Sequence, residues 1–230
     1  DSSAQTVAKD QPMKLAAMEG LAKGGEGMGL IALGFLSTED PDIDNEILKE
    51  YHFKIEIPKL LSYMSFRDWN AYVPGVFDLL HGNEERGLMP ADEKIERGKI
   101  AIQKLSEFKN AKKSGDTGRA EFLQKELTSS SFQENYFKYF GYGYISDLNE
   151  LIPPIALTFY SFHIMVILGF SFILLFALNL IFLIKGKLSN HKWILRLSIL
   201  AIPLVYLAGQ FGWVVSEVGR QPWVVQDLMP

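Results

Sequence analysis

The sequence IMVILGFSFILLFALNLIFLI occupies residues 164–184 and contains no charged residue. Ser171 and Asn179 are its only polar side chains. A helix of about 20 apolar residues spans the ~30 Å hydrocarbon core of a bilayer. Residues 155–163 extend the run toward Pro153 and Pro154, where regular helix is disfavoured. The sequence therefore predicts a transmembrane helix over residues 155–184.

A second uncharged run follows closely, from Leu197 to Val215. It is also long enough to cross a bilayer, and Pro222 forbids further regular helix beyond it. We expect a second transmembrane helix over residues 197–218. The predicted fold is an all-α membrane protein fragment, in which a mostly helical extracytoplasmic loop domain precedes a two-helix transmembrane hairpin.

The short connection between the two runs, residues 185–196, predicts their orientation. It contains Lys185, Lys187, Lys192 and Arg196 and no acidic residue. Short loops rich in lysine and arginine stay in the cytoplasm. Residues 1–154 and 219–230 then lie on the opposite side of the membrane, which is the periplasm in a Gram-negative cell.

The chain of 230 residues carries a net charge of −4. Most of its charged residues lie in the first two thirds of the sequence. From residue 155 onward the charged residues are Lys185, Lys187, Lys192, Arg196, Glu217, Arg220 and Asp227. Residues 1–154 are therefore expected to face water. The absence of cysteine excludes disulfides and thiolate metal sites from this chain, but it is compatible with any compartment. The abrupt ends suggest a piece of a longer chain.

Within residues 1–154, local patterns predict several short elements. A helix is expected near Pro12, and the glycine-rich residues 24–34 are expected to form a flexible turn. The acidic loop 40–45 lacks the order of a calcium-binding EF-hand and is expected to be solvated. Residues 52–57 alternate as a strand does, and residues 91–127 form two amphipathic helices interrupted at 114–118.

The end of the second apolar run places an acid where a helix disfavours it. Glu217 lies in the last turn, where the helix dipole is negative. Its helical neighbours Gln210, Trp213 and Arg220 follow at steps of three and four and share one face. Two interpretations stay open, since either an ion pair with Arg220 or a bound metal would compensate the charge.

Two other pairs of residues are constrained by helical spacing. His163 and Met165 point about 200° apart around a helix, so they cannot both ligate one iron. Lys14 and Glu19 point about 140° apart, so they cannot pair along a helix. A methionine thioether near a helix end is commonly a packing residue, but it can also serve as an axial haem ligand.

Three short sequence motifs, taken in the order in which they occur along the chain, resemble motifs of one family. They are QPMKLAAMEG (11–20), YSFHIMV (160–166) and GWVVSEVGRQPW (212–223). The resemblance is to the large haem-bearing subunit, subunit I, of cytochrome bd-type quinol oxidases. It implies part of an inner-membrane enzyme of the respiratory chain, from the quinol-binding loop through two transmembrane helices. Such an enzyme oxidises ubiquinol or menaquinol, reduces dioxygen to water and generates proton motive force.

The resemblance also implies cofactors and site residues. The cofactors are a low-spin haem b, a high-spin haem b, and either haem d or a second b-type haem. Lys14 and Glu19 match the residues of quinol oxidation. Met165 matches a ligand of the low-spin haem iron, and Glu217 the acid at the high-spin haem iron. The further cofactor-binding residues that it implies are Trp213, Arg220, Gln221 and His163.

Position 163 departs from part of the family, in which an arginine occupies it, and this leaves the role of His163 open. The family's two histidine haem ligands lie on earlier helices. The resemblance therefore implies several partners: the amino-terminal half of the same subunit, a second, smaller subunit, membrane lipid, quinol and dioxygen. We expect no nucleic acid among them.

Two other functions also explain an apolar hairpin with a polar stripe. One is a non-enzymatic extracytoplasmic binding domain on a two-helix anchor. The other is a transporter subunit that uses Glu217 as a proton site. Neither explains why Lys14, Glu19, Met165 and the GRQPW sequence occur together.

Overall fold

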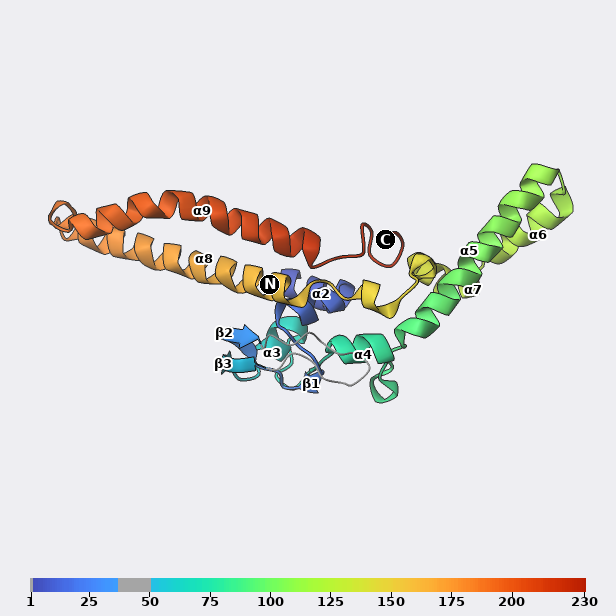
Figure 1. Ribbon diagram of the computed structural model, residues 1–230, viewed down its shortest axis with the longest axis horizontal. Coiled ribbons are helices and arrows are strands. Elements are labelled where there is room, and N and C mark those ends of the chain that lie inside the picture. The colour runs from blue at the N-terminus through green and yellow to red at the C-terminus, as the bar shows by residue number, and fades with distance from the viewer. Residues whose placement is uncertain (1, 37–50) are drawn as a thin grey trace.

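The computed structural model describes residues 2–36 and 51–230, so the acidic loop predicted at 40–45 lies outside the described residues. A long helical hairpin extends from one side of a loop region, and a helical arm extends from the other (Figure 1). Both the first residues of the chain and its carboxyl end lie in the middle of the molecule, near the base of the hairpin (Figure 1).

The hairpin consists of α8 (Ile155–Ile184) and α9 (Lys192–Val218), with the short helix η4 (Leu188–Asn190) between them. Both helices are long and apolar enough to cross a membrane, and most of their side chains are exposed to the surroundings of the chain. One polar contact joins them directly, because Asn179 Nδ2 donates to Ser198 Oγ at 3.0 Å. The hairpin is therefore held mainly by apolar packing.

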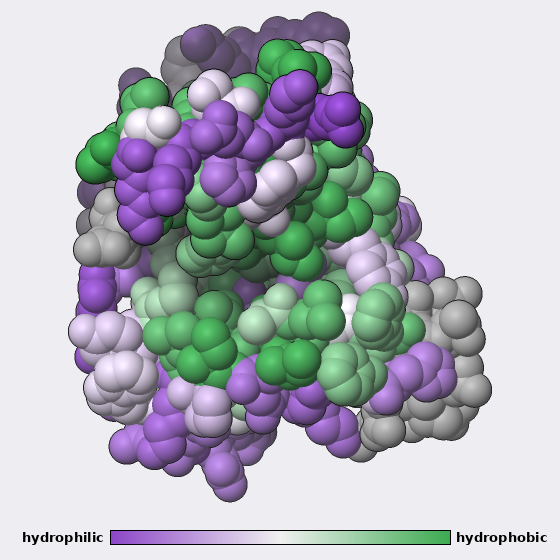
Figure 2. Space-filling model, turned by 90° about the vertical axis from the view of Figure 1, so that its left-hand side faces the viewer, coloured by the Kyte–Doolittle hydropathy of each residue, from purple (hydrophilic) through white to green (hydrophobic). Residues whose placement is uncertain are grey.

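Helix α9 begins at Lys192, five residues before the start that hydropathy predicts. Lys192 and Arg196 occupy its first turns and are exposed. Long basic side chains can extend so that their charged ends reach water. Lys192 and Arg196 therefore interrupt the run of apolar residues without interrupting the helix. Viewed from this end, hydrophilic residues gather at the tip, and hydrophobic residues lie beside and below it (Figure 2).

The loop region begins with α1 (Ser2–Asp10) and α2 (Pro12–Met18) and also contains α3 (Leu60–Phe66) and α4 (Val76–His81). Two small antiparallel sheets accompany them. Their strands are β1 (Gly25–Glu26) with β4 (Tyr72–Val73), and β2 (Leu30–Leu36) with β3 (Tyr51–Ile57).

The strand expected at 52–57 is confirmed by β3, and the helix expected near Pro12 by α2. The prediction that residues 24–34 form only a turn is wrong, because β2 starts within it at Leu30. Ile31 and Leu36 of β2 are buried against Phe159 of α8, and this packing outweighs the flexibility of the preceding glycines. The described chain is thus mostly helical, with four short strands, of which only β3 was expected from the sequence.

The arm consists of α5 (Ala91–Ser114), α6 (Thr117–Leu127) and α7 (Ser130–Asn135). The predicted interruption between two amphipathic helices is confirmed, with α5 ending at Gly115 (φ 77°) and Asp116 capping α6 through Arg119 N. The helix η1 (Glu84–Arg86) precedes the arm. Two further 3₁₀ segments follow it, η2 (Phe137–Tyr144) and η3 (Leu148–Leu151).

Close backbone contact joins the arm to the loop region. A Cβ on Gly98 of α5 would collide with the backbone nitrogen of Gly143 in η2. No side chain fits at either position without moving the backbone, so glycine allows α5 and η2 to touch directly.

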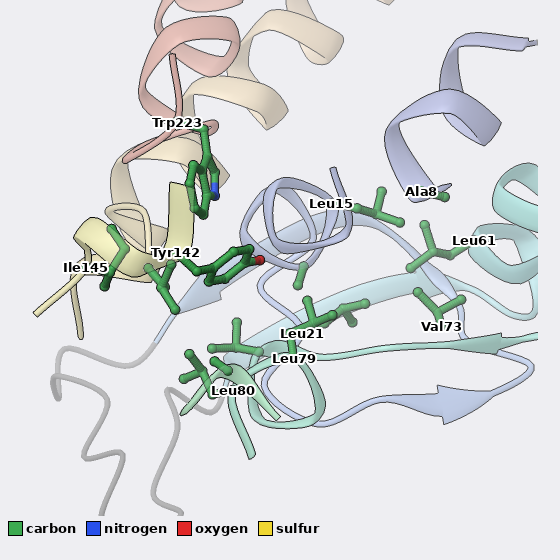
Figure 3. Close-up of a cluster of buried hydrophobic side chains, with 14 residues drawn as sticks. Ala8, Leu15, Leu21, Leu61, Val73, Leu79, Leu80, Tyr142, Ile145 and Trp223 are labelled. Atoms are coloured by element: carbon green, nitrogen blue, oxygen red, sulfur yellow. The ribbon is translucent and has the colours of Figure 1, made fainter. Parts of the chain in front are cut away.

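The main hydrophobic core contains residues from α1 and α2 together with Trp223, which lies beyond α9 (Figure 3). The rings of Trp223 and Tyr142 pack with centroids 4.7 Å apart. Gly141 N also donates to the backbone oxygen of Asp227 at 2.9 Å. The segment that follows the hairpin is therefore part of the core of the loop region.

Candidate functional site

Glu19 lies at the carboxyl end of α2 and is 1% exposed. Its Oε2 accepts a hydrogen bond from Ile31 N at 3.3 Å. Its backbone oxygen accepts one from the Tyr51 hydroxyl. Strands β2 and β3 therefore each contribute one contact that fixes this acid.

Burial changes the ionisation of Glu19. The loss of solvent raises the pKa of its carboxyl group from 4.5 to about 7, and the Ile31 amide opposes this only in part. A carboxyl group that titrates near neutral pH can exchange a proton under physiological conditions. This property is characteristic of functional acids and bases.

A cavity of about 360 Å³ lies beside Glu19. Glu19 does not line it, but its two partners Ile31 and Tyr51 do. Lys54 and Glu56 of β3 also form part of the wall and are joined by an ion pair of 2.8 Å. The cavity therefore combines an apolar wall with a few charged groups, as small-molecule sites commonly do.

Lys14 has different surroundings from Glu19, although both lie on or next to α2. Its stem packs over Gly219, where a Cβ would lie 3.3 Å from Lys14 Cγ. Burial lowers the pKa of Lys14, the charge of Arg220 lowers it further, and the charge of Glu217 opposes both. The expectation that Lys14 and Glu19 do not pair agrees with these separate surroundings.

Glu217 and Arg220 form an ion pair, with Arg220 Nη2 donating to Glu217 Oε2 at 2.6 Å. Their side chains are 40% and 36% exposed, respectively. One of the two open interpretations, the ion pair, is thus realised in the chain as it stands. The pair uses only one carboxylate oxygen, so Oε1 is left outside it. Trp213 is 62% exposed and Gln221 is also exposed.

His163 and Met165 point away from each other, as helical spacing predicts. The sulfur of Met165 faces α9, where it lies 3.0 Å from the position of a Cβ on Gly212. His163 is buried, and its Nε2 lies 3.0 Å from the Ile31 carbonyl oxygen of β2. The two side chains therefore serve different sites.

The donor atoms fit haem iron better than they fit a bare metal ion. Among the described residues, no three His, Cys, Asp or Glu side chains gather in a way that would hold a metal ion. A porphyrin supplies four nitrogen ligands, so one thioether or one carboxylate is enough from this chain. Met165 faces a neighbouring helix at a glycine, and Glu217 keeps one oxygen outside its ion pair. Their donor types are therefore compatible with a haem iron, with one donor atom from each residue.

A second polar cluster lies beneath Trp223, around a cavity of about 130 Å³. It contains Lys94, Tyr142 and Asp227. Burial lowers the pKa of Lys94 and raises the pKa values of Tyr142 and Asp227. No sequence motif indicates this cluster, because its members come from α5, η2 and the segment after α9.

The partners of Glu19 were also not predicted. Ile31 acts through its backbone, which has no residue signature, and Tyr51 is separated from Glu19 by 32 positions. The alternating pattern of residues 52–57 was a useful signal, because it indicates a strand, and a strand requires a second strand to pair with.

Comparison with known proteins places these residues in a family. Residues 1–230 match the family described as cytochrome bd terminal oxidase subunit I. The chain is 31% identical over 241 residues to cytochrome bd-II ubiquinol oxidase subunit 1 of Escherichia coli (strain K12), covering 100% of this chain and 43% of that protein. It is 28% identical over 227 residues to cytochrome bd ubiquinol oxidase subunit 1 of Bacillus subtilis (strain 168), covering 98% and 34%.

The fold is also similar to a solved structure, that of the bd oxidase from Geobacillus thermodenitrificans, with a TM-score of 0.57 and 23% identity. That match covers 99% of this chain and 35% of the other. The chain thus spans less than half the length of each of these relatives. Because the family match extends along all of the described helices and both apolar spans, the chain belongs to the cytochrome bd terminal oxidase subunit I family.

Proposed function

We propose that this chain is part of the large subunit of a terminal oxidase that oxidises quinol and reduces dioxygen to water. The observation that carries this proposal is Glu19, a buried carboxyl group with a pKa of about 7 beside a cavity of about 360 Å³. Oxidation of a quinol releases two electrons and two protons. A base that titrates near neutral pH is suited to accept such a proton from a quinol hydroxyl group.

Glu19 is the proposed proton acceptor, and its position is fixed by Ile31 and Tyr51. Lys14 is the second proposed residue of quinol oxidation. It lies near Arg220 and Glu217, so it connects the quinol side of the loop region with the end of α9. Substrate protons would leave from the loop region.

Haem supplies the electron-transfer and oxygen chemistry when it is bound. Met165 would ligate the low-spin haem b iron, and Glu217 the high-spin haem b iron. Trp213, Arg220, Gln221 and His163 would surround these cofactors. Haem d or a second b-type haem, together with the remaining ligands, would involve the rest of the same subunit.

The proposed partners follow from the incomplete site. They are the amino-terminal half of the same subunit, a smaller second subunit and membrane lipid. We place the protein in the bacterial cytoplasmic membrane, with the connection between α8 and α9 in the cytoplasm and the loop region in the periplasm. The four basic residues around that connection and the length of both helices support this orientation.

The test is quinol-driven oxygen consumption by the full-length complex. Glu19→Gln removes the base but keeps the shape of the side chain, so turnover should fall while the haem spectrum stays intact. Glu84→Gln, at an exposed glutamate that does not line the cavity, is the matched control and should retain turnover. In the unaltered complex, turnover should also fall as the pH drops below about 7, where Glu19 becomes protonated.

Met165→Leu tests the haem assignment in the same complex. The change conserves volume and typically costs less than about 1.5 kcal/mol in packing. We expect the low-spin haem b bands to disappear from the reduced-minus-oxidised spectrum at normal protein abundance. Absence of all haem bands from the unaltered full-length protein would instead support a binding domain on a membrane anchor.

A further inference from the structure

His163 is a buried polar side chain in the first third of α8, a predominantly apolar helix. The ring is 6% exposed and packs on the ring of Phe159, with centroids 4.0 Å apart. Both ring nitrogens face backbone carbonyl oxygens: Nδ1 lies 2.9 Å from Phe159 O, and Nε2 lies 3.0 Å from Ile31 O. The first contact stays within α8, and the second crosses to β2.

The contact to β2 involves the same residue that binds Glu19. Ile31 N donates to Glu19 Oε2, and the Ile31 carbonyl oxygen faces His163 Nε2. Among the described residues, strand β2 belongs to a two-stranded sheet, so one of its edges has no strand neighbour there. Unpaired edge groups that are buried require other partners. Glu19 and His163 are those partners at Ile31.

A second chain of contacts closes the arrangement. The Tyr51 hydroxyl donates to the backbone oxygen of Glu19. The Tyr51 ring packs against Phe159, with centroids 5.8 Å apart, and Phe159 packs against His163. The acid of the loop region is therefore connected to α8 by two routes, one through Ile31 and one through Tyr51.

We propose that His163 is a positioning residue for Glu19. Its contact with the Ile31 carbonyl oxygen fixes strand β2, and the Ile31 amide of that strand binds the Glu19 carboxyl group. This inference rests on the proposed role of Glu19 in quinol oxidation. It gives position 163 a function directed at the quinol side of the loop region. The resemblance associates the same position with the low-spin haem, so the two assignments require separate readouts.

Three substitutions divide the contacts of His163. The amide nitrogen of glutamine can occupy the position of Nε2, so His163→Gln keeps a donor for the Ile31 carbonyl. The amide nitrogen of asparagine reaches only the position of Nδ1. His163→Asn therefore keeps the contact within α8 and loses the contact with the Ile31 carbonyl oxygen of β2. His163→Phe keeps the ring packing and loses both ring nitrogens.

The experiment measures quinol-driven turnover, its pH profile, and the spectrum and reduction potential of the low-spin haem in the full complex. Because small misplacements of a reacting group are costly, His163→Asn and His163→Phe should each lower kcat about tenfold, and His163→Gln should restore it. The acid limb of the pH profile should move to lower pH in the Asn and Phe variants. Without the contact to β2, the Glu19 carboxyl group becomes more exposed to water, and its pKa falls. Any change in the low-spin haem potential should be the same in the Asn and Gln variants, which differ in turnover.

The titratable groups that face this cluster are Tyr51 and Glu56 from β3 and Tyr160 from α8, and they are present in every variant. Combining His163→Asn with Glu19→Gln should add no further loss of turnover, because both act on one step. Additive losses would overturn the positioning role. Equal turnover of the Asn and Gln variants, or a shift in haem potential that follows turnover, would overturn it too.

The outcomes also separate this inference from the proposed function. Full turnover of Glu19→Gln alone would overturn the role of Glu19 in quinol oxidation. Slow turnover of Glu19→Gln, with no difference between His163→Asn and His163→Gln, would overturn only the role of His163. Should His163→Phe fail to accumulate, the Asn and Gln variants still decide the question.

Discussion

The helical hairpin and the loop region are stabilised in different ways. In α8 and α9, large apolar side chains such as Phe170 and Ile202 are about 70% exposed, as expected for helices that have a bilayer as solvent. In the loop region, several polar side chains are buried or partly buried and form hydrogen bonds. Asp78, for example, accepts hydrogen bonds from Gly24 N, Gly75 N and the Tyr72 hydroxyl.

This difference decides which residues can be understood from local sequence. A hairpin residue depends on its own hydropathy and on the lipid around it. A loop residue such as Glu19 depends on partners that are distant in sequence. Two polar residues of the hairpin, His163 and Glu217, lie close to the loop region, where the two kinds of environment meet.

The largest predicted effect concerns the separation of the two ends of the hairpin by the membrane. Ser114 and Ser189 are both exposed. In a full-length protein without other cysteines, Ser114→Cys should react with a membrane-impermeant maleimide in intact spheroplasts, and Ser189→Cys should not. After lysis, both should react. If only Ser189→Cys reacted in intact spheroplasts, the hairpin would have the opposite orientation to the one proposed.

The next effect distinguishes a cofactor ligand from a structural ion pair at the end of α9. Glu217→Ala should abolish the high-spin haem b signal and oxygen reduction, whereas Arg220→Ala should weaken both less. Reduced-minus-oxidised spectra at matched protein abundance provide the measurement. If both variants only lower abundance, and the remaining protein has a normal spectrum, the pair is structural.

A smaller effect is expected from the core of the loop region. Trp223 is 6% exposed and packs on Tyr142, so Trp223→Ala should lower the free energy of unfolding of this region by about 3–5 kcal/mol. Native-state proteolysis of the intact complex measures this opening. Phe122 is 68% exposed, and Phe122→Ala should change the same quantity by less than about 0.5 kcal/mol. Equal protease sensitivity of the two variants would contradict the packing seen here.

The smallest effect is a pH dependence of stability at Glu19. Its pKa rises from 4.5 to about 7 on folding, so the folded state favours the protonated carboxyl group. The corresponding stability is complete below pH 4.5 and is lost as the pH rises through about 7. The full loss is about 3 kcal/mol. Glu19→Gln should therefore reduce the fall in the unfolding temperature of the complex between pH 5 and pH 8, and Glu56→Gln should not.

The sequence predicted the hairpin well, because hydropathy acts through each residue separately. Helix α8 has the bounds that its apolar run indicates, and α9 ends at Val218 as expected. The early start of α9 at Lys192 was missed, since basic side chains end a hydropathy run without ending a helix. The first two helices of the arm, α5 and α6, were predicted from the glycine-containing interruption between them.

The candidate site was only partly accessible from sequence. The resemblance indicated Lys14, Glu19, Met165 and Glu217, and spacing indicated which of them cannot meet. The bond of His163 to Ile31 joins residues 132 positions apart and uses a backbone oxygen, so no residue pattern indicates it. The proximity of Lys14 to Arg220 likewise depends on how α2 docks against the end of α9.

The position of Trp223 also has a consequence for the order in which the protein forms during synthesis. The core of the loop region contains residues of α1 and α2 and is completed by Trp223, which the ribosome adds only after both α8 and α9. Domains generally fold from the amino terminus as the chain emerges, but this one lacks an essential side chain until the hairpin has been made. The loop region should therefore remain open until the second helix has inserted, and during that interval its apolar residues would need protection from aggregation.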